Sequence, residues 1–250
     1  MLSFNGEQKI KDEWVAKGHY HAKMDMIEFG TYGKGYGDNF KGCTIGCYAE
    51  RGAADKHQNV ANFVDGSKRL NLCRDAIFEG LSRFNKSLGI AFHTQWIEAI
   101  PIGVDTASFE RVVDKLILKS AEWKAEQCGE PNNRFLLDAA ALYRRRIGGD
   151  EPSELEWERS VRDVIDVRAA RAARNISSVL VIRDARQAHN MRSALYTSDV
   201  LDALAALDVL DARNSCGVRT VLDVRDAPEG FYISMRDEYL KLMFEMENKF

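Results

Sequence analysis

The chain has 250 residues, of which 45% are hydrophobic and 29% are charged, and its formal net charge at pH 7 is -3. This composition is typical of a soluble globular protein of one large domain or two small ones. The small net charge gives no footprint of a nucleic-acid or anionic-membrane partner, and no apolar run approaches the roughly 20 residues that span a bilayer. We therefore expect a protein or a small molecule as partner.

The start of the chain lacks the basic residues and apolar core of a signal peptide, which predicts a cytoplasmic protein. Its five cysteines are thinly spread over the sequence: Cys43, Cys47, Cys73, Cys128 and Cys216. An odd number of distant cysteines without a secretory signal favours reduced thiols over a disulfide framework. We expect no bound cofactor.

The first predicted helix lies close to the N-terminus. Asn5 and Gln8 have the form of a capping pair, and the apolar pattern that follows predicts a helix as far as about Phe29. On this helix His21 and Asp25 are one turn apart and face the apolar side. Burying either group without a hydrogen-bond partner costs about 1–3 kcal/mol. Each of the two therefore needs a partner, which can be the other group, the backbone, water or a ligand.

A glycine-crowded loop follows, with five glycines between residues 30 and 42. Its segment GKGYGD (33–38) suggests a phosphate cradle in which Lys34 supplies charge, and Tyr32 is a further candidate ligand-binding residue. A dinucleotide fingerprint should follow a strand, whereas this loop follows a helix and has glycines at every second position. A lid over Cys43 and an ordinary surface loop are both alternatives.

The stretch KGCTIGC places Cys43 and Cys47 four residues apart directly after the loop. If a helix begins after Gly42, Cys43 lies at its N-terminal end, where backbone N–H groups and the helix dipole stabilise a thiolate. A cysteine nucleophile also needs an imidazole. This pattern predicts Cys43 as nucleophile, His21 as base and Asp25 as the group that orients it. The alternative is that these residues simply pack in the core.

A small zinc site is a second alternative. His19, His21, Cys43 and Cys47 supply suitable donor atoms. Their H-x-H and C-x-x-x-C spacing does not match the paired ligands of common zinc sites. We therefore predict no metal ligand from the sequence.

Further helices are predicted along the chain. Leu70, Cys73, Ile77 and Leu81 repeat at helical spacing, and a second apolar repeat ends before Pro101. Two more helices are expected at about 106–127 and 132–147. Helical geometry directs Glu79 away from the apolar stripe of Leu70, Ile77 and Leu81, which predicts a solvent-facing side chain.

Residues 148–152 contain two glycines and a proline, which interrupt a helical pattern. We therefore place a boundary here between a helical unit of residues 1–149 and a second helical unit of residues 150–250. Ser153 and Glu156 form a capping box that opens the next helix. Short similar phrases recur at 164–168, 179–183, 209–213 and 221–225, but their irregular offsets disfavour a solenoid. The predicted fold class is all-α, with one or two strands left open near 177–182.

The C-terminus predicts a closing helix that docks through Leu240, Met243 and Phe244. Spacing of this kind is typical of an amphipathic helix with one buried side.

The phrases HAKMDMIEFGTY, KGCTIGC, AIFEGL and AIPIGVD resemble a family of uncharacterised bacterial and phage proteins that combine GKGC-x-x-GC, IFEGL and AIP-x-G-x-D in this order. The resemblance covers about the first 105 residues, and the Ala- and Arg-rich C-terminal part is similar in composition. It implies a common unit without an assigned activity. Family motif positions fall on His21, Asp25, Gly30, Tyr32, Gly42, Cys43, Gly46, Cys47 and Glu79. Family members carry a histidine where this chain has Glu50.

Two functional hypotheses follow from the sequence. The first is a helical binding or regulatory module of bacterial or phage origin, with Tyr32, Lys34, Cys47 and Glu79 as candidate ligand-binding residues. The second is a cysteine-dependent hydrolase or transferase that uses Cys43, His21 and Asp25.

Overall fold

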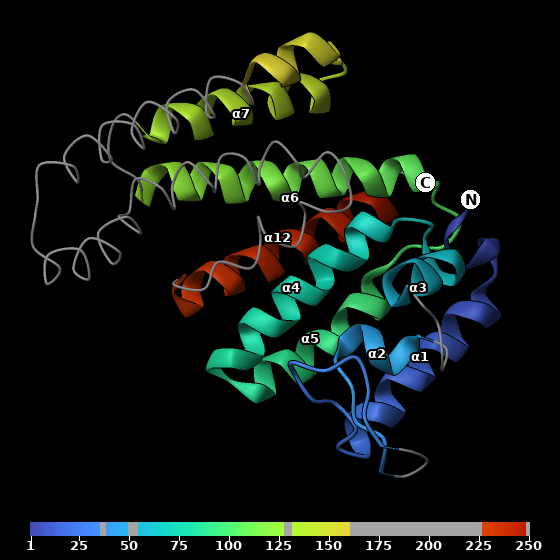
Figure 1. The fold of residues 1–250 in the computed structure, drawn as a ribbon. Coiled ribbons are helices and arrows are strands. Elements are labelled where there is room, and N and C mark those ends of the chain that lie inside the picture. Colours follow the sequence, from blue (N-terminus) through green and yellow to red (C-terminus); the bar gives the residue numbers. More distant parts are fainter. Residues whose placement is uncertain (36–38, 50–54, 128–131, 161–226, 249–250) are drawn as a thin grey trace, which may run out of the picture. The chain divides into compact units, whose positions relative to one another are not determined.

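A computed structural model describes residues 1–35, 39–49, 55–127, 132–160 and 227–248. Within these residues the fold is helical and contains no β-strand, so the all-α prediction is confirmed (Figure 1). The elements are the 3₁₀ helix η1 (Ser3–Gly6) and the α-helices α1 (Gln8–Lys23), α2 (Thr44–Tyr48), α3 (Lys56–Val64), α4 (Lys68–Phe84), α5 (Lys86–Ala99), α6 (Thr106–Gln127), α7 (Asn132–Ile147) and α12 (Glu229–Glu247). The recurring phrases and the possible strand near 177–182 lie outside the described residues.

The chain forms two compact units. The first comprises Met1–Leu116 and Leu222–Phe250, and the second comprises Ile117–Val221. The first unit holds all of the candidate site residues named above. The boundary predicted after residue 149 stays a prediction.

Helix α4 is the central element of the first unit, where it contacts α2, α3, α5 and α12. The Ser67 side chain caps its start by accepting a hydrogen bond from the Leu70 N–H. All four residues of the predicted apolar stripe are buried, from Leu70 to Leu81. Burial of each large apolar side chain contributes about 1.5–3 kcal/mol, so this stripe fixes the rotation of α4 and thereby the direction of its polar residues.

Helix α12 lies beside α4 and α5, although more than a hundred residues of sequence separate them (Figure 1). Its buried side includes Tyr232, Met235, Tyr239 and Met243, whereas Phe244 is 65% exposed. Met243 is buried as predicted, whereas the prediction that Phe244 docks is wrong. The buried residues of α12 repeat at helical spacing from Phe231 onward, and Phe244 lies on the opposite side of the helix, which faces solvent.

The end of α1 differs from the prediction. The helix stops at Lys23, and Asp25 has a left-handed backbone with φ of 51°. The chain turns here because Met26 and Ile27 are buried beside Gly42, whose N–H donates to the Met26 carbonyl. Asp25 therefore does not share a helix face with His21, and that prediction is wrong.

The second unit shows half of the predicted capping box, because the Glu156 N–H donates to the Ser153 carbonyl and not to its side chain. The Ser153 N–H donates to the Glu156 carboxylate at 2.8 Å, and a helix begins at residue 154. The Tyr143 and Trp157 rings pack edge to face with centroids 5.3 Å apart. In the described part of the chain, no helix combines the length and the apolar character that crossing a membrane requires.

Candidate metal centre

Cys43 is the N-cap residue of α2, as the sequence predicted for the start of this helix. Its Sγ accepts a hydrogen bond from the Gly46 N–H at 3.4 Å, and only 1% of the residue is exposed. The Tyr32 carbonyl lies where a Cβ of residue 46 would be, at 2.1 Å. Glycine at position 46 therefore allows the loop before α2 to pass directly over the cysteine.

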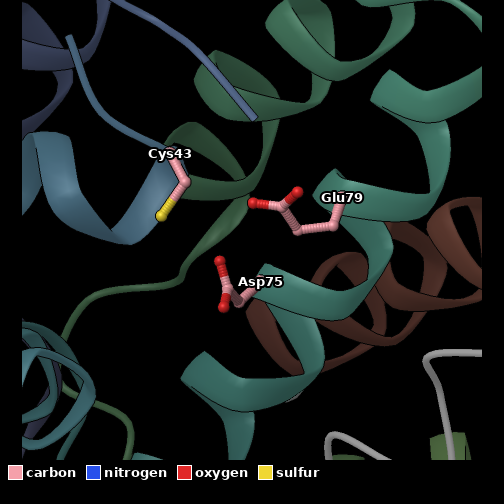
Figure 2. Close-up of side chains that lie close together, drawn as sticks. All are labelled: Cys43, Asp75 and Glu79. Atoms are coloured by element: carbon pink, nitrogen blue, oxygen red, sulfur yellow. The ribbon is translucent and has the colours of Figure 1, made fainter. Parts of the chain in front are cut away.

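Asp75 and Glu79 extend toward Cys43 from successive turns of α4 (Figure 2). Residues four apart lie on one side of a helix, and this side faces α2. The Cys43 Sγ and one oxygen of each carboxylate lie within 4.8 Å of one another. Cys43 and Asp75 are buried, and Glu79 is half-buried. Glu79 is thus half-buried rather than turned fully to solvent as predicted, because α4 packs against α2 on this side.

His57 and Tyr32 surround Asp75. The His57 Nε2 lies 3.3 Å from the Asp75 Oδ2, and the Tyr32 hydroxyl donates to the same oxygen at 3.2 Å. The two rings meet edge to face with centroids 5.4 Å apart. His57 comes from α3 and is buried. Asp75 is thus oriented by two donors from different elements, as carboxylates that bind metals usually are.

The electrostatics of the cluster favour a cation. Burial raises the pKa of the Cys43 thiol, and the negative charge of Asp75 raises it further. The thiol is therefore protonated at neutral pH. A divalent cation at this position reverses the balance, because it attracts both carboxylates and stabilises the thiolate.

The donor set fits a transition metal of borderline softness. Thiolate and carboxylate groups bind Zn²⁺, Co²⁺ and Fe²⁺ in proteins. Bond lengths of about 2.1 Å to oxygen and 2.3 Å to sulfur separate tetrahedral ligand atoms by about 3.4–3.6 Å. The three ligand atoms lie within 4.8 Å of one another, so a contraction of at most about 1.4 Å brings them to these separations.

The predicted catalytic residues are not joined by hydrogen bonds. Asp25 is exposed and pairs with Lys41 and Lys86, each at 2.9 Å, and these bonds lower its pKa to about 2. His21 is buried, and burial followed by the charge of Lys17 lowers its pKa to about 4. The His21 Nδ1 has no hydrogen-bond partner in the described part of the chain. The catalytic roles of Cys43, His21 and Asp25 stay predictions, and these contacts do not support them.

The other predicted ligands also have separate partners. Lys34 is exposed and pairs with Glu28, and the Cys47 thiol donates to the Gly42 carbonyl at 3.4 Å. His19 lies 2.6 Å from Glu98 on the exposed side of α1. Among the described residues, the four ligands of the predicted zinc site do not form one group.

Tyr32 and Glu79 are the predicted ligand-binding residues that do reach the cluster, whereas Asp75 and His57 were not predicted. A signal for Asp75 was present, since two acidic residues four apart on a helix share one side. His57 had no such signal because it reaches Asp75 only through the packing of α3 on α4.

Comparison of the chain with protein-family models, curated proteins and solved structures gives no match in any of the three. The family resemblance described above therefore stays an expectation.

Proposed function

We propose that this chain is a helical binding module that holds a divalent transition-metal ion, with Cys43, Asp75 and Glu79 as its protein ligands. One observation carries the proposal: three donor atoms from α4 and from the start of α2 lie within 4.8 Å of one another, and Cys43 and Asp75 are buried. One thiol and two carboxylates, one of them buried, thus offer a divalent cation three donor atoms in one place. A cytoplasmic location and a bacterial or phage origin belong to this proposal and rest on the sequence.

Three protein ligands distinguish this site from a closed structural zinc site. Structural zinc ions usually have four protein ligands, whereas three leave a position for water or another small ligand. His57 contacts Asp75 and not the thiol in the described geometry, so its role is to orient the carboxylate. The site can therefore bind a small molecule through the ion.

Titration of metal-free, reduced protein with Zn²⁺ in a calorimeter tests this function. We expect one ion per chain, and a higher melting temperature with the ion bound because it binds only the folded state. Asp75→Asn and Glu79→Gln should each weaken binding at least tenfold.

Glu98→Gln is the matched control, because Glu98 is exposed and pairs with His19 away from the cluster. This variant should bind Zn²⁺ as the unmodified chain does. Absence of binding, or equal loss in all three variants, would contradict the proposed function.

A further inference from the structure

The segment that covers the metal centre bonds to all three proposed ligands. The Gly30 N–H donates to the Glu79 carboxylate, at 2.8 and 3.0 Å from its two oxygens. The Thr31 carbonyl accepts from the Cys43 N–H at 2.6 Å. The Tyr32 hydroxyl donates to Asp75 at 3.2 Å. Three consecutive residues thus each hold a different ligand residue, and we call residues 30–32 the clasp.

Two glycines allow the backbone of the clasp to lie over the cluster. Gly30 has φ of 77°, a left-handed conformation that disfavours residues with a side chain. Gly46 leaves room for the Tyr32 carbonyl directly above α2. The clasp therefore lies over the cluster because of local backbone geometry, and its hydrogen bonds to the ligands add to this.

These hydrogen bonds are compatible with a bound ion. Each carboxylate oxygen has two lone pairs. The Asp75 Oδ2 accepts from both Tyr32 and His57, so Asp75 would coordinate a metal through its Oδ1. A Glu79 oxygen that accepts from the Gly30 N–H can still coordinate a metal. Donors of this kind hold the ligand in the orientation that the ion requires, and removing one typically weakens metal binding by about 10–100-fold.

We propose that closure of the clasp and ion binding at Cys43, Asp75 and Glu79 are coupled, with Tyr32 as a positioning residue. The inference rests on the proposed function. Coupling between two events is reciprocal, so a clasp that strengthens ion binding is itself held more firmly when the ion is bound. Gly30 and Tyr32 are exposed at the surface, and the ion would therefore regulate the order of a segment that a partner can contact.

Zinc titration of Tyr32→Phe tests this coupling, because the substitution removes only the hydroxyl that donates to Asp75. We expect binding at least tenfold weaker than in the unmodified chain. Tyr20→Phe is the matched control, since Tyr20 is half exposed on α1 and its ring lies against His21. The control should bind Zn²⁺ within twofold of the unmodified chain.

Amide hydrogen exchange of the unmodified chain gives a second measurement that does not depend on any variant. The Gly30 and Cys43 amides, which bond to Glu79 and Thr31, should exchange more slowly with saturating Zn²⁺ than without it. The Lys11 amide, which donates to the carbonyl of Glu7 just before α1, should change little.

The outcomes separate the two proposals. If the unmodified chain does not bind Zn²⁺, the proposed function is wrong. If it binds Zn²⁺ while Tyr32→Phe binds equally well and the two clasp amides exchange at unchanged rates, the metal centre stands and the coupling is wrong. Should Tyr32→Phe fail to fold, the exchange rates of the unmodified chain decide.

Discussion

Two adjacent residues of α4, Arg74 and Asp75, belong to different buried clusters. Arg74 is fully buried, and its guanidinium bonds to Asp65 at 2.6 Å, to Asn71 at 2.6 Å and to the Tyr239 hydroxyl at 3.0 Å. It also stacks over the Trp96 ring at 4.6 Å. Asp75 faces Cys43 and Glu79 instead.

The difference between the two clusters is one of charge. In the Arg74 cluster a cation and an anion neutralise each other, and the other groups that accept hydrogen bonds from Arg74 are the neutral side chains of Asn71 and Tyr239. In the Cys43 cluster two carboxylates converge on a thiol. His57, which is charged only when protonated, lies 3.3 Å from Asp75. The Arg74 cluster joins α4 to α12 through the bond to Tyr239, whereas the Cys43 cluster is suited to binding a cation.

Disrupting the Arg74 cluster should have the largest effect on stability. Arg74→Met leaves Asp65 buried without its cation, and removal of one partner of a buried ion pair costs about 3–5 kcal/mol. Urea unfolding should show this loss. Arg134→Ala is the control, since Arg134 is 77% exposed and its pair with Asp138 is long, at 3.8 Å; we expect a change below about 0.5 kcal/mol. Equal losses in the two variants would contradict a special role of Arg74.

His21 tests what burial, together with the charge of Lys17, does to a polar group. Its pKa is about 4 in the folded protein and 6.5 as the ordinary value, so the unfolded chain binds the proton more tightly. Stability due to this residue is fully present above pH 6.5 and is lost as the pH falls toward 4, by at most about 3 kcal/mol.

Unfolding of His21→Gln between pH 7 and pH 4 measures this contribution. The variant should lose less stability on acidification than the unmodified chain. His19→Gln, at an exposed position two residues earlier, should follow the unmodified chain. An unchanged acid response of His21→Gln would show that other groups dominate it.

Asp75→Asn should show the opposite pattern to Arg74→Met. It weakens two hydrogen bonds but also removes one of two neighbouring negative charges, and these effects offset each other. In metal-free protein we expect a change in stability below about 1 kcal/mol, together with a large loss of zinc-dependent stabilisation. A loss of several kcal/mol without metal would place Asp75 with the structural residues.

The reactivity of Cys43 gives the smallest expected difference. Cys43 and Cys73 are both buried, and burial raises the pKa of both thiols. An alkylating reagent at pH 8, in the absence of metal, should label the two at similarly low rates because the thiolate is the reactive form. Much faster labelling of Cys43 would instead support the cysteine-nucleophile hypothesis.

Local sequence patterns predicted much of the fold. The bounds of α6 and α7 match those expected, and the apolar stripe of α4 is buried, because helical periodicity is a local property. The end of α1 was missed because it depends on the burial of Met26 and Ile27 beside Gly42. The approach of Asp75 to Cys43 depends in the same way on the packing of α4 against α2, which periodicity does not encode.

The central claim is that the Cys43 sulfur coordinates a metal ion together with carboxylates from α4. Titration of metal-free protein with Co²⁺ tests it most directly, since a cobalt–thiolate bond produces a charge-transfer absorption band in the near ultraviolet. We predict that this band saturates at one ion per chain, is lost in Cys43→Ser and persists in Cys73→Ser. Absence of the band in the unmodified chain, or its persistence in Cys43→Ser, would contradict the account.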